Sequence, residues 1–245
     1  MKRILPFIII VLVLGVALVS AWALKKRSTN TVTPVANNLN STTPADPSAG
    51  VIIGVPGSEP AHTLGPATAP ARLEEFGDFE CPPCGAFNPI LLQMHKEFGD
   101  KLQITFREFP LVPAHQHAIA AASAAEAAGL QGKFWEMHDK LYENQNSWVP
   151  PVTDPLPIFS GFAKDIGLNV NQFKTDYASS KVNDAISADL AAFAKTGQEQ
   201  ATPTFYMDGV YLPNSQLVDS TSGAPTADKI GAAIQAEIDK KSSAK

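Results

Sequence analysis

The sequence predicts an α/β domain with the order strand, helix, strand, a block of helices, a β-hairpin and a last helix. Three observations favour this class. A strand pattern over residues 71–76 leads into an amphipathic helix, and an alternating strand pattern follows over 102–107. A helical block then extends over about 113–197. Beyond it, Asp208-Gly209 separates two short apolar runs, which is a strong hairpin signal.

The chain begins with an apolar segment. Ile4 to Leu24 has no charged residue and is flanked by Lys and Arg on both sides. Because this run is long enough to cross a bilayer, residues 1–27 are predicted to be a transmembrane anchor. Ala21-Trp22-Ala23 also fits a cleavage signal, so a removed signal peptide is the alternative. The nearly balanced flanking charges do not fix the orientation.

Residues 28–60 are interpreted as a flexible linker, since Thr, Asn, Pro, Ser and Ala dominate there without a sustained apolar period. Residues 61–245 suffice for one well-buried domain. The whole chain has 19 Lys and Arg against 24 Asp and Glu, a formal net charge of −5. An acidic chain without basic clusters is a poor nucleic-acid binder, so no nucleic-acid partner is expected.

The elements of the domain follow from their periodicities. After the strand over 71–76, apolar residues recur at helical spacing as far as Phe98, and Gly99 is expected to end that helix. The next strand completes a right-handed βαβ unit with parallel strands. The remaining elements are expected to be helices over 114–130, 134–142, 158–166, 170–177 and 181–195, strands over 204–207 and 210–212, and a helix capped by Thr226.

The two cysteines of the chain, Cys81 and Cys84, lie where the first strand turns into the helix. Residues three apart in a first turn share a face, so their sulfurs can approach bonding distance. Free amides and the helix dipole favour a thiolate at Cys81, which we expect to be exposed and ionised. Cys84 is expected to be the sheltered, resolving partner. Pro82 and Pro83 are compatible with a first helical turn.

Other interpretations of the two cysteines are weaker. A zinc site needs two more ligands, and the sequence has no second CxxC and no HxxxH. A structural disulfide would close too short a loop to contribute much chain entropy. Unpaired core thiols are a third alternative, and a redox-active dithiol is favoured over all three. His115 and His117 are interpreted as surface helix residues, because residues two apart on a helix do not face each other.

Four segments of the sequence together resemble one known family. The chain resembles the DsbA-like thiol:disulfide oxidoreductases of the thioredoxin superfamily, in which a helical domain is inserted into a thioredoxin fold. The resemblance extends over residues 60–240 in the same order. The segments that carry it are Phe79-Glu80-Cys81-Pro82-Pro83-Cys84-Gly85, Ala114-His115-Gln116-His117-Ala118, Gly132-Lys133-Phe134-Trp135-Glu136-Met137-His138 and Thr202-Pro203-Thr204-Phe205.

The resemblance implies a role for individual residues. Cys81 matches the nucleophilic cysteine and Cys84 the resolving one. Pro203 matches the proline that is cis in this superfamily and lies against the dithiol. Its cis bond would expose the backbone of Thr202 to an extended substrate. Thr202, Pro82 and Pro83 are therefore the candidate substrate-binding residues.

Glu75 matches the position of the superfamily's buried acid. A carboxylate buried there would have a raised pKa and could exchange protons with Cys84, which makes Glu75 a candidate catalytic residue. The alternative is an ordinary surface residue of the strand, and the neighbouring Glu74 leaves the register open.

The chain departs from the strong oxidants of the family at Pro83, where they have a histidine. Asp78 and Glu80, if ionised, would also oppose a thiolate at Cys81 as like charges. The resemblance therefore implies a disulfide that is less oxidising than that of the strongest family members. It implies no dissociable cofactor.

The expected function is a membrane-anchored oxidoreductase whose catalytic domain lies outside the cytoplasm. It would exchange its Cys81–Cys84 disulfide with cysteines of client proteins and form their disulfides. A membrane redox partner, quinone-linked in similar systems, would reoxidise the pair. The alternatives are a reductase or isomerase kept reduced by a membrane partner, and a non-catalytic thioredoxin-like module that binds client chains.

Overall fold

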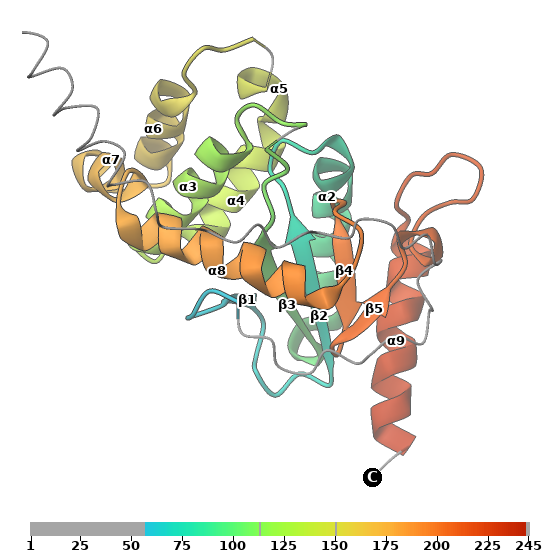
Figure 1. Ribbon diagram of the computed structural model, residues 1–245. Coiled ribbons are helices and arrows are strands. Elements are labelled where there is room, and N and C mark those ends of the chain that lie inside the picture. The colour runs from blue at the N-terminus through green and yellow to red at the C-terminus, as the bar shows by residue number, and fades with distance from the viewer. Residues whose placement is uncertain (1–56, 113, 150, 244–245) are drawn as a thin grey trace, which may run out of the picture. The chain divides into compact units, whose positions relative to one another are not determined.

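The computed structural model describes residues 57–112, 114–149 and 151–243, and Figure 1 shows their arrangement. The predicted transmembrane anchor and residues 28–56 of the predicted linker lie outside this part of the chain. None of the helices that are described has both the length and the apolar character needed to cross a bilayer.

Five strands form one mixed sheet in the order β1-β3-β2-β4-β5. The strands are β1 (His62–Leu64), β2 (Ala71–Gly77), β3 (Leu102–Glu108), β4 (Thr204–Met207) and β5 (Val210–Leu212). β2 and β3 are parallel, and the other neighbouring strands are antiparallel. The predicted parallel βαβ unit and the hairpin are confirmed, whereas β1 was not predicted.

The turn of the hairpin shows why Asp-Gly predicts it. Asp208 and Gly209 both adopt positive φ, at 50° and 80°, which suits the tight turn between β4 and β5. Asp208 also accepts hydrogen bonds from Arg72 Nε over 3.1 Å and lies 2.6 Å from Lys241 Nζ. The turn residue thereby joins the hairpin to β2 and to the last helix.

Helices occupy most of the rest of the domain. They are α2 (Pro82–Phe98), α3 (Ala118–Gly129), α4 (Phe134–Glu143), α5 (Gln145–Trp148), α6 (Leu156–Asp165), α7 (Val170–Tyr177), α8 (Ser180–Thr196) and α9 (Ala227–Ser243). The helix predicted over 114–130 begins four residues later, because Leu111 O accepts from the amides of Ala114 and His115 and these amides are not part of the helix. α5 was not predicted.

The two faces of the sheet carry different helices because side chains alternate along a strand. Leu73, Ile104 and Phe205 point to the face that α2 and α9 cover. Phe76 and Tyr206 point to the opposite face, where they pack with α8. Figure 1 shows α8 crossing the sheet, while α3, α4, α6 and α7 gather on one side of it. The inserted helices thus flank the sheet next to the point where α2 begins.

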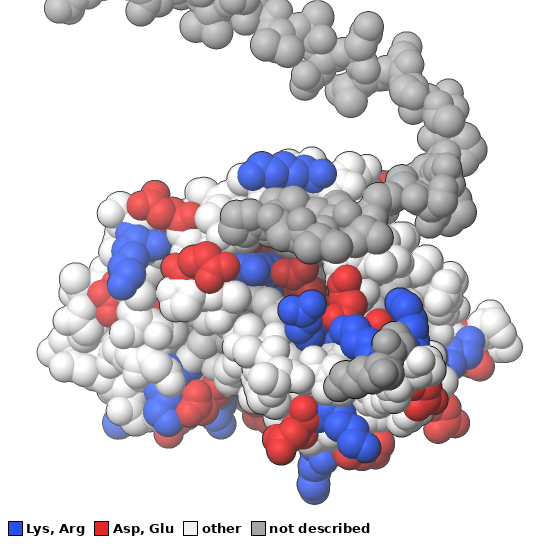
Figure 2. All heavy atoms as spheres, turned by 90° about the horizontal axis from the view of Figure 1, so that it is seen from below, with Lys and Arg blue, Asp and Glu red and all other residues white. Residues whose placement is uncertain are grey.

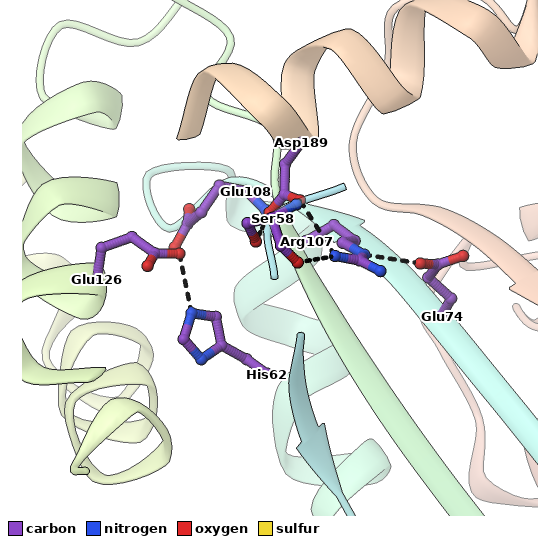
Figure 3. A network of polar contacts seen from close by, with 7 residues as sticks. All are labelled: Ser58, His62, Glu74, Arg107, Glu108, Glu126 and Asp189. Atoms are coloured by element: carbon purple, nitrogen blue, oxygen red, sulfur yellow. Dashed lines mark hydrogen bonds and ion pairs between the residues drawn. The ribbon is translucent and has the colours of Figure 1, made fainter. Parts of the chain in front are cut away.

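A buried polar network, drawn in Figure 3, joins β2 and β3 to α8. We call Ser58, Glu74, Arg107 and Asp189 the Arg107 network. Asp189 is fully buried and accepts from the amide and hydroxyl of Ser58 over 2.6 and 3.1 Å. Arg107 donates to Ser58 O and to Glu74 Oε1 over 2.8 Å each, and to Asp189 Oδ1 over 3.3 Å. These bonds join the segment at Ser58 to β2, β3 and α8.

Candidate active site

The two cysteines lie at the junction of β2 and α2. Cys81 is the N-cap residue of α2, in extended conformation, and Cys84 is in the first helical turn. Both are free thiols. Pro82 and Pro83 open the helix, where the missing amide hydrogens cost no intrahelical bond. Both prolines are exposed, so they form the outer surface of the helix start beside Cys81.

The burial of the two cysteines differs from the prediction in one respect. Cys84 has no exposed surface, as predicted for the sheltered partner. Cys81, predicted to be exposed, keeps only 5% of its surface and is buried. One reason is that the segment before β4 lies against it, since Cys81 Sγ is 3.4 Å from Thr202 O. Cys81 therefore presents only a small part of its surface to solvent.

The Thr202–Pro203 segment completes the site from a part of the chain 121 residues away. The peptide bond between these residues is cis, which is the geometry that the family resemblance implies. Pro203 is buried, and its carbonyl accepts from Asn214 Nδ2 over 2.7 Å. The carbonyl of Thr202 faces the sulfur of Cys81. Thr202, Cys81 and Pro203 are therefore brought together, as the sequence predicted.

The environments of the two thiols push their pKa values apart. A hydrogen bond from the Cys84 side chain, with help from Thr202, lowers the pKa of Cys81 to about 6, against burial and the charge of Asp78, which raise it. Burial, followed by the hydrogen bond to Cys81, raises the pKa of Cys84 well above that of an ordinary thiol. At neutral pH this favours a thiolate at Cys81 and a neutral thiol at Cys84.

Glu75 is the buried acid of the site. It is 3% exposed, on the same sheet face as Phe106 and α2, and its Oε1 atom has no hydrogen-bond partner. Burial, and next the charge of Cys81, raise its pKa to about 8. Glu74 instead pairs with Arg107 and is partly exposed. The choice of Glu75 over Glu74 as the buried acid is confirmed, whereas its role in proton transfer remains a prediction.

The acids that precede Cys81 have partners that the sequence did not predict. Asp78 Oδ2 lies 2.7 Å from His115 Nδ1, and Glu80 Oε2 accepts from the amide of His117 over 2.5 Å. The interpretation of both histidines as surface helix residues is wrong. They precede α3 in a turn, and His117 is 5% exposed because this turn packs onto residues 78–80.

Gln145 and Tyr142 are two further residues of the site that sequence reasoning missed. Gln145 Nε2 donates to the carbonyls of Phe79 and Cys81 over 2.8 and 3.0 Å, which fixes the backbone before α2. Gly85 leaves room for it, since a Cβ there would lie 3.0 Å from Gln145 Oε1. The Tyr142 hydroxyl is buried without a partner, and burial, with Cys84 as the next cause, raises its pKa. Neither residue belongs to a recognisable spacing pattern.

An apolar layer backs the dithiol. Phe79 packs against Phe106 and Tyr142, with ring centroids 5.1 and 4.9 Å away, and His138 meets it edge-on. Within the described part of the chain, no group of His, Cys, Asp and Glu side chains is arranged to hold a metal ion. Two thiols with pKa values shifted in opposite directions can carry out exchange at sulfur, and a buried acid lies beside them.

Comparison with known proteins places this geometry in a family. The thioredoxin family profile matches residues 58–235. The chain belongs to the thioredoxin family. Among solved structures, the oxidised BdbD of Bacillus subtilis has a TM-score of 0.58 at 25% identity, covering 72% of this chain and 92% of that one. The α-DsbA1 of Wolbachia pipientis has a TM-score of 0.60 at 19% identity, covering 74% and 92%. The chain therefore shares its fold with these two solved proteins.

The curated relatives are longer proteins. The Na(+)/H(+) antiporter NhaA 1 of Salinispora arenicola is 34% identical over 179 residues, which are 73% of this chain and 26% of the relative. That of Mycolicibacterium vanbaalenii is 38% identical over 153 residues, 61% and 23%. The chain spans about a quarter of the length of these relatives. The similarity therefore concerns a thioredoxin-like part of each antiporter.

Charged side chains of both signs lie on the face seen in Figure 2, where Lys and Arg are mixed with Asp and Glu. The formal net charge of the whole chain is −5.

Proposed function

We propose that the protein forms disulfides in client proteins outside the cytoplasm by transferring its Cys81–Cys84 disulfide. The observation that carries this proposal is the asymmetry of the two thiols, with the pKa of Cys81 lowered to about 6 and that of Cys84 raised. A stabilised Cys81 thiolate favours the reduced pair, which makes the disulfide a better electron acceptor.

The reaction has two exchange steps. A client thiolate attacks the Cys81 sulfur, the Cys81–Cys84 bond breaks, and Cys84 leaves with the electron pair and takes a proton. Glu75, whose pKa is about 8, is the candidate donor of that proton. A second client thiolate then attacks the client sulfur of the mixed disulfide and releases Cys81 as a thiolate. Two electrons have passed from the client to the pair, and the client holds a new disulfide.

Three residues next to Cys81 are the candidate substrate contacts. Pro82 and Pro83 are exposed beside Cys81, and Thr202 presents its backbone within 3.4 Å of the sulfur. An extended client segment that pairs with the backbone of Thr202 would bring its cysteine to Cys81. This contact needs no particular client side chain, which suits an enzyme with many substrates.

Location and partner belong to the same proposal. Residues 1–27 would anchor the domain at the outer side of a membrane, and a membrane oxidant would accept the two electrons and restore the disulfide. One solved structure that resembles this chain is a periplasmic thioredoxin-like protein from Salmonella enterica, which supports a location outside the cytoplasm. No transport activity is carried over from the antiporters, because the chain matches only part of them.

A reductase or isomerase is the second candidate, and one observation favours it. The pKa of Cys81, about 6, lies between the values of about 7 for thioredoxin and about 3.5 for DsbA. The reduction potential of the Cys81–Cys84 couple tests the choice. Reoxidation of a reduced, denatured client supports the oxidant, and activity in insulin reduction alone supports the reductase. Failure in both assays would leave a non-catalytic client-binding module.

A further inference from the structure

The turn between β3 and α3 places an imidazole against the acid that precedes the dithiol. His115 Nδ1 lies 2.7 Å from Asp78 Oδ2, and the amide of Leu111 donates to the same oxygen over 2.8 Å. The Asp78 side chain has no exposed surface, whereas that of His115 keeps 19%. Because a carboxylate can only accept, His115 donates a hydrogen from Nδ1 in this contact.

Asp78 acts on Cys81 through both its backbone and its charge. Its carbonyl oxygen accepts from the amide of Cys81 over 3.1 Å. Its Oδ1 atom accepts from the amide of Glu80 over 2.8 Å, which fixes the backbone between the acid and the thiol. The negative charge of Asp78 raises the pKa of Cys81. A group that orients this carboxylate and offsets its negative charge therefore affects the pKa of Cys81 indirectly.

We propose that His115 is a positioning residue for Cys81, which fixes the buried Asp78 carboxylate and offsets its negative charge. The inference rests on the proposed role of Cys81 as the nucleophile. It explains how a thiolate is favoured although Pro83 occupies the position of a histidine in similar strong oxidants. The imidazole is supplied from a turn 37 residues away in sequence, behind the acid instead of between the cysteines.

Other ionisable groups near Asp78 do not take over this role. The charge of Asp78 contributes to the raised pKa values of Glu108 on β3 and Tyr142 on α4, both of which burial keeps in the neutral form. Cys84 is neutral for the same reason. The Glu80 carboxylate accepts a hydrogen bond from the backbone amide of His117, and this amide carries no charge. Of these surrounding side chains, His115 is the one that can bring a positive charge to Asp78.

Two substitutions in the full chain test the proposal. His115→Ala removes the hydrogen bond to the Asp78 carboxylate, and we expect it to raise the pKa of Cys81 by about half a unit to one unit. His115→Asn keeps an amide donor near Nδ1 and is expected to show a smaller shift. The ultraviolet absorbance of the thiolate is followed against pH, and mass spectrometry assigns the alkylated sulfur. The reduction potential is expected to fall with the thiolate.

A matched control is His95→Ala. It removes an imidazole that lies on α2 roughly 20 Å from Cys81 along the helix, and it should leave the titration of Cys81 unchanged. Circular dichroism checks the fold, and His115→Asn carries the test if His115→Ala does not fold. An ordinary thiol titration of Cys81 in the wild type would contradict the proposed function itself. A low wild-type pKa that both His115 variants retain would overturn only the role of His115.

Discussion

The Arg107 network and the dithiol site start from the same two strands but treat buried charge in opposite ways. Burial raises the pKa of Asp189 in the network and of Glu75 in the site. Hydrogen bonds from Ser58 and Glu108 and the charge of Arg107 oppose the shift at Asp189, whereas Glu75 Oε1 has no partner. Paired buried charge joins the elements of the domain, while an unpaired acid beside a sulfur is placed to provide the proton of the proposed exchange.

Glu108 belongs to both regions. Its amide donates to Asp189 Oδ2 over 3.0 Å, within the structural contacts of Figure 3. Its carboxyl oxygens have no partner, and burial, with the charge of Glu126 next, raises its pKa well above the ordinary value. Along β3, a buried cation with acidic partners, Arg107, is therefore followed directly by a buried acid whose carboxyl oxygens have none, Glu108.

The largest effect is expected from Cys81→Ser. Thiol–disulfide exchange should fall roughly a thousandfold or more, since Cys84, the other thiol of the described site, has no exposed surface. Cys84→Ser cannot form the Cys81–Cys84 disulfide, but its Cys81 thiolate can attack a disulfide of an oxidised client and release one client sulfur as a thiolate. The resulting mixed disulfide should accumulate, because no Cys84 is present to resolve it. Stability should change little in Cys81→Ser, because the side chains are similar in size. Client reoxidation and trapping on gels measure both variants, and exchange that persists without Cys81 would contradict the assignment of the nucleophile.

The next largest effect is expected in the Arg107 network. Arg107→Ala leaves Asp189 buried without its cation, and we expect a loss of about 3–5 kcal/mol in the free energy of unfolding. Urea unfolding of the oxidised protein measures it. Arg72→Ala is the control, since the side chain of Arg72 is 57% exposed and pairs with Asp208 at the surface. A loss below about 1 kcal/mol in Arg107→Ala, as expected for a surface pair, would show that the network does not hold the domain together.

Glu75→Gln tests the buried acid of the dithiol site through the pH dependence of stability. The pKa of Glu75 is raised to about 8 in the folded protein, so its stabilising contribution is complete below the unfolded value of 4.5 and is lost as the pH rises toward 8. The variant should flatten this part of the pH–stability profile by a few kcal/mol. It should also slow the release of Cys84. Glu97→Gln, on the exposed side of α2, is the control; identical profiles for Glu75→Gln and wild type would contradict the burial of a neutral acid.

The sequence predicted those features that depend on neighbouring residues. The period of apolar residues and the Asp208-Gly209 turn predicted β2, α2, β3 and the hairpin, because each is decided within a few residues. β1 and α5 have only three and four residues and are too short for a periodic signal. The position of Pro203 beside the dithiol came from the family resemblance, not from any local pattern.

The features that were missed depend on contacts between distant parts of the chain. Cys81 was predicted to be exposed, because its own segment shows nothing of the Thr202 backbone 121 residues later. His115 was taken for a helix residue, since the alanine-rich run continues past it. Its partner Asp78 lies in another element, and only the fold decides that the turn before α3 packs there. Helix propensity was overruled at this end by tertiary contacts.

The smallest effect is expected at a surface pair that resembles neither region. Lys133 Nζ lies 2.6 Å from Glu136 Oε1, but the two side chains are 43% and 45% exposed. The hydrogen bond from Lys133 lowers the pKa of Glu136, so the contribution is present above the unfolded pKa and is lost as the pH falls through the folded one. Because solvent screens it, Lys133→Ala should cost less than about 0.5 kcal/mol in urea unfolding. A cost near that of Arg107→Ala would mean that a short distance alone, without burial, decides what an ion pair contributes in this domain.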